Sequence, residues 1–545
     1  MEARSRSTVV GDSTTSAIWT LLSRVTGFGR VILIGAVLGP SYFGNLFQLA
    51  NQFPWIVFEL AIGALLGALL VPGLMTHISA GDLEATERLA GRFLGFVLAV
   101  FGAVTVVVMA GSFLIVRGLA APIGDQAVRD DFIAAGVPLL LLTGPQLIGY
   151  GIAVTGQAVQ QALGHFALPA AASIVENLVV IVTLIGFAAR YGTGLEVGDV
   201  GLGPILLLGL GSSLGVAAHA ALQWWGVHRL GIRLVPRRDW SSSDMRSIID
   251  QARTSSGTAV LNGLRILVLI VAANTVAGGV VAFQLAINLL NLPVALGSKP
   301  VAFAILPRLS EARIAGDLRA LVDIYARGVG MASFVSIPAA AASLTLGWFV
   351  AGGLAVGEMA GDDGERLILY ALAGIAGAVI GEGLFQVATS AAYACTDPAG
   401  PLRAQGLRAA LTALGAGICL VLVDGPVVIL WLGLAMSAAD LVGSGALHRR
   451  VMDLASSAYD LNRSLILTTL AAAVAFGGAA GAGIGYRAVW SEPQHQLAVL
   501  GVTGVIAAAA MVVFVLLRSR FDDELTALVA EFRHRGSARP TAGAS

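Results

Sequence analysis

Long apolar runs constrain this chain more than any other feature of its sequence. Fourteen such runs recur along the 545 residues, and each is close to the roughly 20 residues that a helix needs to cross a bilayer. Only 12% of the residues are charged, whereas soluble domains carry about 25%. With a mean hydropathy of +0.83, the sequence excludes the soluble classes and predicts an all-α, polytopic membrane protein with about 14 transmembrane helices.

The boundaries of these runs are approximate, and the second run is too long for one untilted crossing. The expected spans are 12–38, 42–76, 93–116, 132–154, 166–189, 202–227, 256–277, 280–305, 328–354, 367–392, 407–423, 426–447, 464–486 and 496–517.

The basic residues predict the orientation of these spans. With an even number of spans, 24 Arg side chains fall on the side of the N-terminus, 5 fall on the opposite side, and the other four basic residues lie within spans. Cytoplasmic loops carry the excess of Arg and Lys, so both termini are expected in the cytoplasm. Residues 1–16 are basic but carry no cleavage motif, and we expect the first helix to stay in the protein.

Two segments outside the spans have the pattern of amphipathic helices. In SSSDMRSIIDQAR (241–253), Met245, Ile248 and Ile249 share one helical face. The tail RFDDELTALVAEFRHR (520–535) repeats apolar residues at helical spacing opposite its charges. Both segments are expected to lie on the cytoplasmic membrane surface.

An internal echo predicts two related halves. FQLANQFP (47–54) is similar to FQLAINLLNLP (283–293), and Pro54 and Pro293 are 239 residues apart. Parallel repeats of this kind are common in secondary transporters, where the substrate site lies between the halves. The expected parts are an N-lobe of six helices (1–230), an amphipathic linker (231–255), a C-lobe of six helices (256–450), two further helices (451–517) and an amphipathic tail (518–545).

Two arginines lie six residues apart in the first expected span. A helix turns about 100° and rises about 1.5 Å per residue, so Arg24 and Arg30 are about 120° apart around the axis and about 9 Å apart along it. They can both border a wide cavity. Ionisable groups at membrane depth are costly unless they face water, a partner or a substrate, and Arg binds phosphate bidentately. Arg24 and Arg30 are therefore candidate ligands of a phosphate or pyrophosphate; alternatively, one of them snorkels to an interface or pairs with Glu59.

Further charges lie within the expected spans. Arg265 lies in the seventh span and is a third candidate substrate-binding residue, although snorkelling explains it equally well. The buried-looking acids are candidate charge partners or proton carriers, and His219 is expected to be a polar packing residue. These acids are Glu59, Glu176, Glu382 and Asp440.

The sequence contains no signature of an enzyme, a cofactor or a nucleic-acid site. There is no Walker sequence, no H-E-x-x-H and no G-x-S-x-G, and the net charge is zero. Cys395 and Cys419 form neither a disulfide framework nor a metal site. We therefore expect no enzyme activity, no cofactor, no bound metal and no nucleic-acid partner.

Several motifs resemble those of the MurJ/MviN family of the multidrug/oligosaccharidyl-lipid/polysaccharide exporter superfamily. Ser23-Arg24-Val25-Thr26-Gly27-Phe28-Gly29-Arg30 is similar to the family motif S-R-V-x-G-x-x-R. LNLPVALGSKPVAFAILPRLSEA (290–312) resembles the end of the family's eighth span, and LGHFALPAAASIVENLVVI and YACTDPAGPLRAQ resemble two cytoplasmic turns. The likeness covers roughly 10–450, and fourteen spans is the family's number.

The resemblance implies a flippase that works by alternating access on lipid II, the undecaprenyl-pyrophosphate-linked precursor of peptidoglycan. Arg24 and Arg30 match arginines that the family needs for function. Other family positions differ: Asn45 replaces an acid, Phe58, Glu59 and Asn288 replace arginines, and Gly63 replaces a glutamate. The carboxylates of the sodium site described for some members are also missing from spans seven and eleven.

Sequence and resemblance together predict a divergent flippase of the cytoplasmic membrane. Its expected substrate is a polyprenyl-linked glycan precursor, and its expected partners are membrane lipids and envelope-synthesis proteins. Two alternatives remain open: an exporter of drugs or small lipids, coupled through an intramembrane acid, and a non-transporting scaffold for cell-envelope synthesis.

Overall fold

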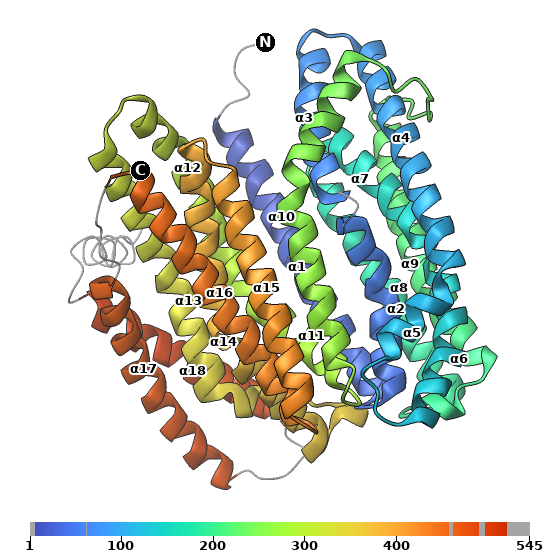
Figure 1. The fold of residues 1–545 in the computed structure, drawn as a ribbon, viewed down its shortest axis with the longest axis vertical. Coiled ribbons are helices and arrows are strands. Elements are labelled where there is room, and N and C mark those ends of the chain that lie inside the picture. The colour runs from blue at the N-terminus through green and yellow to red at the C-terminus, as the bar shows by residue number, and fades with distance from the viewer. Residues whose placement is uncertain (1–5, 61–62, 457–461, 490–495, 520–545) are drawn as a thin grey trace, which may run out of the picture. The chain divides into compact units, whose positions relative to one another are not determined.

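The protein is helical throughout the part of the chain that its computed structural model describes, which is residues 6–60, 63–456, 462–489 and 496–519 (Figure 1). No strand occurs in those ranges, and the prediction of an all-α membrane protein is confirmed. The first half contains α1 (Arg6–Leu38), α2 (Tyr42–Leu60), α3 (Gly63–Ser79), α4 (Leu83–Ala110), α5 (Ser112–Ala120), α6 (Gln126–Thr143), α7 (Gln146–Ala162), α8 (Ala167–Tyr191), η1 (Val197–Asp199) and α9 (Leu202–Arg229).

The second half is built in the same way from long apolar helices joined by short turns. It contains α10 (Ser243–Ala273), α11 (Gly279–Pro293), η2 (Val294–Ser298), α12 (Lys299–Ile314), α13 (Leu318–Leu354), η3 (Gly357–Met359), α14 (Asp362–Ala394), α15 (Ala399–Leu422), α16 (Val427–Leu454), α17 (Asn462–Val489) and α18 (Gln496–Ser519).

Each of the fourteen predicted spans falls on one helix or on consecutive helices. Twelve stretches of the described residues are long and apolar enough to cross a membrane. The other two predicted spans, 42–76 and 464–486, are not among these twelve stretches. The long run 42–76 is described as α2 and α3 on either side of residues 61 and 62, with Pro54 inside the first and Pro72 inside the second. The apolar part of α17 is the shorter stretch Leu465–Gly481.

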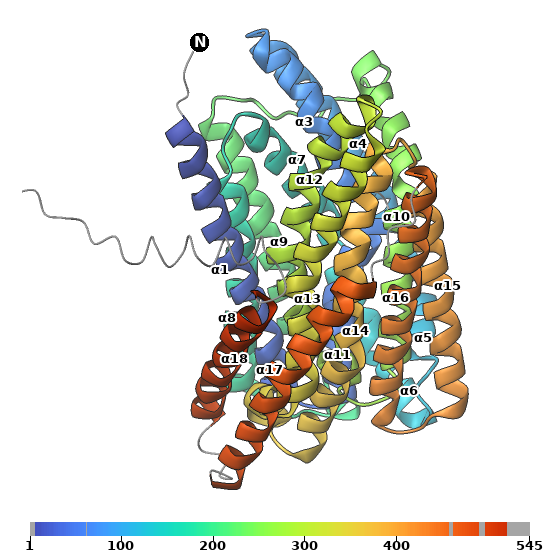
Figure 2. The same cartoon turned by 90° about the vertical axis from the view of Figure 1, so that its left-hand side faces the viewer.

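The chain forms two compact units. Unit 1 comprises residues 1–289, 355–370 and 405–435, and unit 2 comprises residues 290–354, 371–404 and 436–545. In unit 1, α8 packs against both α1 and α9, and α7 packs against α3, α4 and α9. Figure 2 shows α1 lying alongside α8. In unit 2, α17 and α18 pack on α13, where the rings of Phe334 and Phe514 are 5.2 Å apart. The domain boundaries expected from the internal repeat remain a prediction.

The predicted amphipathic segment after the sixth span belongs to a longer helix. Ser242 accepts a hydrogen bond from Met245 N and starts α10, which continues without a proline to Ala273. Met245 and Ile248 are buried, and Ile248 lies close to Gly73 of α3. The apolar face of this segment thus packs on protein. The predicted amphipathic tail, 520–535, lies outside the described residues.

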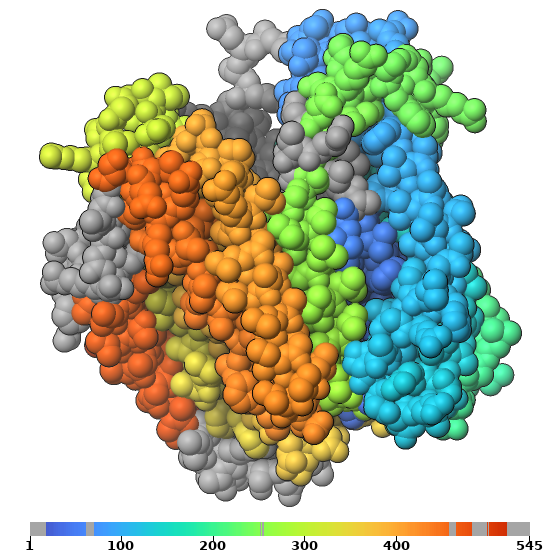
Figure 3. All heavy atoms as spheres, viewed as in Figure 1, coloured from blue at the N-terminus to red at the C-terminus, as the bar shows by residue number. Residues whose placement is uncertain are grey.

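An extended segment, residues 230–242, joins α9 to α10 and lies on α4 (Figure 3). We call it the linker. Arg237 N donates a hydrogen bond to Gly91 O at 2.8 Å. Two glycines of α4 allow this approach, since a Cβ on Gly95 would lie 2.8 Å from the carbonyl carbon of Arg237.

Side chains hold the linker beside this backbone contact. Arg92 Nη2 of α4 lies 2.6 Å from Asp239 Oδ2, and the Trp240 ring meets Phe96 edge-on with centroids 5.8 Å apart. The hydrogen bond from Ser241, together with the Arg92 charge, lowers the pKa of the Asp239 carboxyl below its ordinary value. The linker is therefore an ordered strap on α4.

Candidate functional site

The arginine-bearing part of α1 is held against α8 by small polar side chains. Ser23 Oγ and Ser173 Oγ are 2.7 Å apart, and Asn177 Nδ2 donates to Thr26 Oγ1 at 3.1 Å. Gly27 faces Asn177, and a Cβ there would lie 3.4 Å from Nδ2. Small residues let helices approach closely within membranes, and hydrogen bonds across the contact fix their register. This contact determines the direction in which the α1 arginines point.

Four helices of unit 1 bring their polar side chains together around one carboxylate. Arg30 Nη1 of α1 lies 3.8 Å from Glu176 Oε1 of α8. His219 Nδ1 of α9 lies 2.8 Å from Glu176 Oε2, and Tyr150 Oη of α7 donates to Glu176 Oε1 at 3.5 Å. The Arg30 side chain is 19% exposed, and those of Glu176 and His219 are 13% exposed. We call these four residues the Glu176 cluster.

Both ring nitrogens of His219 contact polar side chains. A carboxylate only accepts, so His219 Nδ1 donates to Glu176. Gln223 Nε2 lies 3.4 Å from His219 Nε2, and its own Oε1 accepts from Gln160 Nε2 at 2.7 Å. Glu176 thus has the guanidinium of Arg30 and the imidazole of His219 as its neighbours.

Arg30 has donor capacity that Glu176 does not use. At 3.8 Å its contact with Glu176 is an ion pair rather than a hydrogen bond. Its Nε is buried and has no hydrogen-bond partner among the described residues. A guanidinium has five N–H donors, so Arg30 can accept an anionic ligand without leaving Glu176.

The surroundings of the Arg24 side chain differ from those of Arg30. Arg24 is exposed, and no described residue forms an ion pair or a hydrogen bond with its side chain. Both arginines lie within the candidate span Ile18–Leu38. The predicted rotation of about 120° agrees with their different surroundings. The structure does not bring the two side chains onto a common protein partner.

Arg265 belongs to a separate polar group between α10 and α15. It is buried, and its Nη2 donates to Asn262 Oδ1 at 3.3 Å. Asn262 Oδ1 also accepts from Gln405 Nε2, and Gln405 Oε1 accepts from Arg408 Nη1 at 2.9 Å. The side chains of two buried arginines are thus connected through the side-chain amides of Asn262 and Gln405. Arg408 lies within α15 and is only 1% exposed.

The remaining predicted acids do not join the Glu176 cluster in the contacts that the structure describes. Glu59 is half-buried near the end of α2. In unit 2, Glu382 Oε1 accepts from Gln386 Nε2 at 2.6 Å, and Asp440 is fully buried in α16. Among the described residues, no group of three or more His, Cys, Asp and Glu side chains could hold a metal ion.

A second polar contact in unit 1 joins the α1–α2 turn to the α10–α11 turn. Asn45 is fully buried; its Nδ2 donates to Asn274 Oδ1 at 3.1 Å and to Val276 O at 2.7 Å. Asn45 Oδ1 accepts from Val280 N at 3.0 Å. Tyr42 Oη donates to Thr275 O. We call this set the asparagine lock, and it closes one end of the contact between α2 and α10.

The family model described as "Lipid II flippase MurJ" matches residues 34–521 of the chain. This chain belongs to the lipid II flippase MurJ family. The probable lipid II flippase MurJ of Rhizobium tropici is 25% identical over 325 residues, which is 59% of this chain and 59% of that protein. The probable lipid II flippase MurJ of Haemophilus influenzae is 25% identical over 342 residues, which is 59% of this chain and 63% of that protein. The matched part thus spans about three-fifths of these MurJ relatives.

Solved structures show the same fold. A lipid II flippase MurJ in an inward closed conformation matches with a TM-score of 0.71 at 15% identity, covering 94% of this chain and 99% of that one. An inward-facing multidrug resistance MATE family transporter of the MOP superfamily matches with a TM-score of 0.64 at 14% identity, covering 82% and 99%. The family model thus confirms the resemblance to the MurJ/MviN family, and the solved structures show the fold.

Family membership leaves the site residues to be argued from geometry. The MurJ match begins at residue 34, so Arg24 and Arg30 precede it. Sequence reasoning named Arg30 and Glu176 separately but did not pair them, and it took His219 as packing. The signal for His219 was available: a histidine in an apolar span requires a polar partner.

Proposed function

We propose that this protein moves a polyprenyl-(pyro)phosphate-linked glycan precursor, lipid II or a related envelope lipid, across the cytoplasmic membrane by alternating access. The observation that carries the proposal is Arg30, a span-embedded guanidinium with an unused donor, on the fold of the MurJ family. Relatives named as lipid II flippases support the choice of substrate class. A scaffold protein would have no use for such a group.

In this proposal the three candidate arginines have different tasks. Arg24 is exposed and has no partner among the described residues, and it contacts the substrate phosphate first. Arg30 binds the phosphate while Glu176 holds its side chain in place. Arg265 contributes positive charge from α10, where Asn262 orients it. Membrane lipids surround the protein, and the termini lie in the cytoplasm, as the distribution of arginines favours.

Glu176 is the acid best placed to couple transport to a proton. It contacts one fixed cation, Arg30, and one titratable group, His219. A proton that arrives on His219 changes the charge of the cluster beside the substrate arginine. Glu59 and Glu382 remain the other candidate carriers.

The asparagine lock supports alternating access. It joins two turns that the internal repeat makes equivalent, at one end of their helices. A transporter that exposes its cavity to one side at a time needs such a closure, and hydrogen bonds can open without leaving buried charge. The lock is therefore the proposed gate.

An exporter of drugs or small lipids is the second candidate. The protonatable Glu176–His219 pair favours it, because proton-driven exporters need a titratable group at membrane depth. Loss of this protein would then sensitise cells to many toxic compounds without an envelope defect.

The test measures lipid II at the outer leaflet of host cells before and after depletion of the protein, with total lipid II measured in the same samples. The proposal predicts that exposure falls while the total rises. If neither changes, another protein flips lipid II, and the lipid-linked glycan that accumulates inside the cell identifies the substrate.

A further inference from the structure

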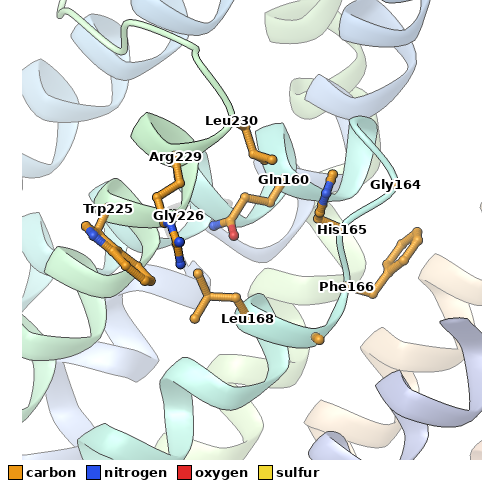
Figure 4. Close-up of a pocket in the computed structure, with 10 residues that line it drawn as sticks. Gln160, Gly164, His165, Phe166, Leu168, Trp225, Gly226, Arg229 and Leu230 are labelled. Atoms are coloured by element: carbon orange, nitrogen blue, oxygen red, sulfur yellow. The ribbon is translucent and has the colours of Figure 1, made fainter.

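A pocket of about 410 Å³ lies at one end of unit 1, away from the Glu176 cluster (Figure 4). It is bounded by the end of α7, the α7–α8 turn and the end of α9. Arg229 is ten residues after His219 on α9, which places the pocket about 15 Å along the helix from the cluster. The pocket is thus a separate site, and nothing in the proposed transport pathway uses it.

The pocket contains a cationic side chain, Arg229, that stacks on an aromatic ring. The Arg229 guanidinium carbon lies 4.7 Å from the centroid of the Trp225 ring, one helical turn earlier. No described residue forms an ion pair or a hydrogen bond with the Arg229 side chain. Stacking on an indole limits the rotamers of an arginine and leaves the edge of its guanidinium free to donate. Figure 4 shows this side chain directed into the pocket, above Leu168.

The rest of the lining favours an anion with an apolar part. None of the ten lining residues is acidic, and His165 adds a second nitrogen-bearing side chain. Phe166 is the N-cap of α8 and makes no side-chain cap hydrogen bond, so the first amide groups of a 25-residue helix add positive potential at Ala167 and Leu168. Gly226 lets the side chains of Gln160 and Leu168 lie close against α9, because a Cβ there would collide with both.

The position of the pocket along the spans indicates the source of the ligand. α8 and α9 are both candidate membrane spans, and the pocket lies where α8 begins and α9 ends. Trp225 and Phe166 are also 47% and 40% exposed, as aromatic residues at a membrane interface are. A group bound there lies at the depth of the phospholipid headgroups.

We propose that this pocket binds the phosphate of an anionic phospholipid, with Arg229 on the phosphate and the lipid's glycerol and upper acyl region against Phe166, Leu168 and Trp225. A soluble phosphate offers nothing to the apolar part of the lining. An anionic headgroup is also favoured over a zwitterionic one, because no acidic side chain lines the pocket to meet a headgroup cation.

The test uses the delipidated full-length protein in detergent. Native mass spectrometry measures the binding of phosphatidylglycerol, phosphatidylcholine and inorganic phosphate. Arg229→Gln is expected to weaken phosphatidylglycerol binding by about tenfold or more, the loss of a charge-assisted contact. Arg238→Gln removes the same charge from the exposed linker, outside the pocket, and is expected to bind as the native protein does.

A second measurement does not depend on any variant. Phosphatidylglycerol carrying a photoreactive group near its headgroup is cross-linked to the native protein, and the labelled peptides are identified. Labels at 160–168 and 225–230 support the proposal. Labels elsewhere only, equal binding by Arg229→Gln and the native protein, equal affinity for phosphatidylcholine, or displacement of the lipid by inorganic phosphate would overturn it.

Discussion

Arg30 and Glu176 depend on each other because neither charge is well solvated where it lies. An ionised side chain inside a membrane span requires a partner, and here the arginine comes from α1 and the carboxylate from α8. His219 and Tyr150 donate to the same carboxylate, which fixes its two oxygens. The pair therefore sets both the charge and the geometry of the candidate site.

Glu176→Gln tests this dependence at a single residue. The amide keeps the size of the side chain but leaves Arg30 with an uncompensated charge, so stability should fall by about 1–3 kcal/mol. Thermal unfolding in detergent measures the loss, and a transport assay should show reduced activity. Glu196→Gln removes an exposed carboxylate from the α8–α9 loop and should change neither value. Equal behaviour of the two variants would show that the Arg30–Glu176 contact has no role.

Asn45→Asp tests the asparagine lock. A carboxylate still accepts from Val280 N, but it faces Asn274 Oδ1 and Val276 O, which are both acceptors. Two lost hydrogen bonds and the repulsion between oxygens should cost about 1–3 kcal/mol and favour the open gate. Labelling of a cysteine placed at Ser41, buried beside the lock, measures the opening. Asn291→Ala removes an exposed amide from α11 and should leave the labelling rate unchanged.

The residue scale also shows where sequence reasoning stops. Arg30, Glu176 and Arg265 were identifiable because a charge in an apolar span is conspicuous. Their partners were not, since the contact between Arg30 and Glu176 joins residues 146 positions apart and depends on how α1 packs on α8. Arg408 lies at the start of an apolar run, and its burial depends on how α15 packs on α10.

At the scale of elements, the linker shows how a loop acquires a fixed position. Gly91 and Gly95 lie one turn apart on α4 and leave a groove for the backbone of Arg237. Trp240 then packs on Phe96 beyond the groove. The strap thus ties the start of α10 to α4.

Gly95→Ala should detach the strap. The added methyl carbon would lie within 3 Å of the Arg237 backbone, so the linker must move off α4. Limited trypsin digestion measures this, because Arg233, Arg237 and Arg238 provide cleavage sites in the linker; the variant should be cut several-fold faster. Gly102→Ala lies on the same helix, with nothing within 4 Å of the new carbon, and should be cut at the native rate. Slow cleavage of both variants would contradict the role of the groove.

The ends of the helices could be predicted from the sequence where a strong helix-breaking signal is present, and could not where that signal is weak. The spans were found because apolar length is a property of the chain alone. The run 42–76 was recognisable as too long for one untilted crossing, and α2 and α3 each contain a proline. The amphipathic segment was expected to be separate, yet no proline interrupts 243–273 and α10 runs through it.

At the scale of the molecule, the fold is retained at very low sequence identity. The chain has 15% identity to a MurJ structure that it matches with a TM-score of 0.71. Apolar pattern, small residues at helix contacts and turn glycines are sufficient to specify such a fold, and they leave the polar residues free to change. Asn45 is an example, because the family resemblance places it at the position of an acid, and here it anchors the asparagine lock. Transport on this fold therefore depends on the polar residues that this chain has, the candidate arginines above all.

The most direct measurement reconstitutes the purified protein in liposomes with lipid II in one leaflet and follows its appearance in the other. We predict that the native protein accelerates translocation far above that in empty liposomes. Arg30→Ala should slow translocation by about tenfold or more, because it removes a charge-assisted phosphate contact. Arg238→Gln, which removes an exposed arginine of the linker, should translocate lipid II at the native rate. Native protein that moves lipid II no faster than empty liposomes, or Arg30→Ala that matches the native rate, would contradict the account.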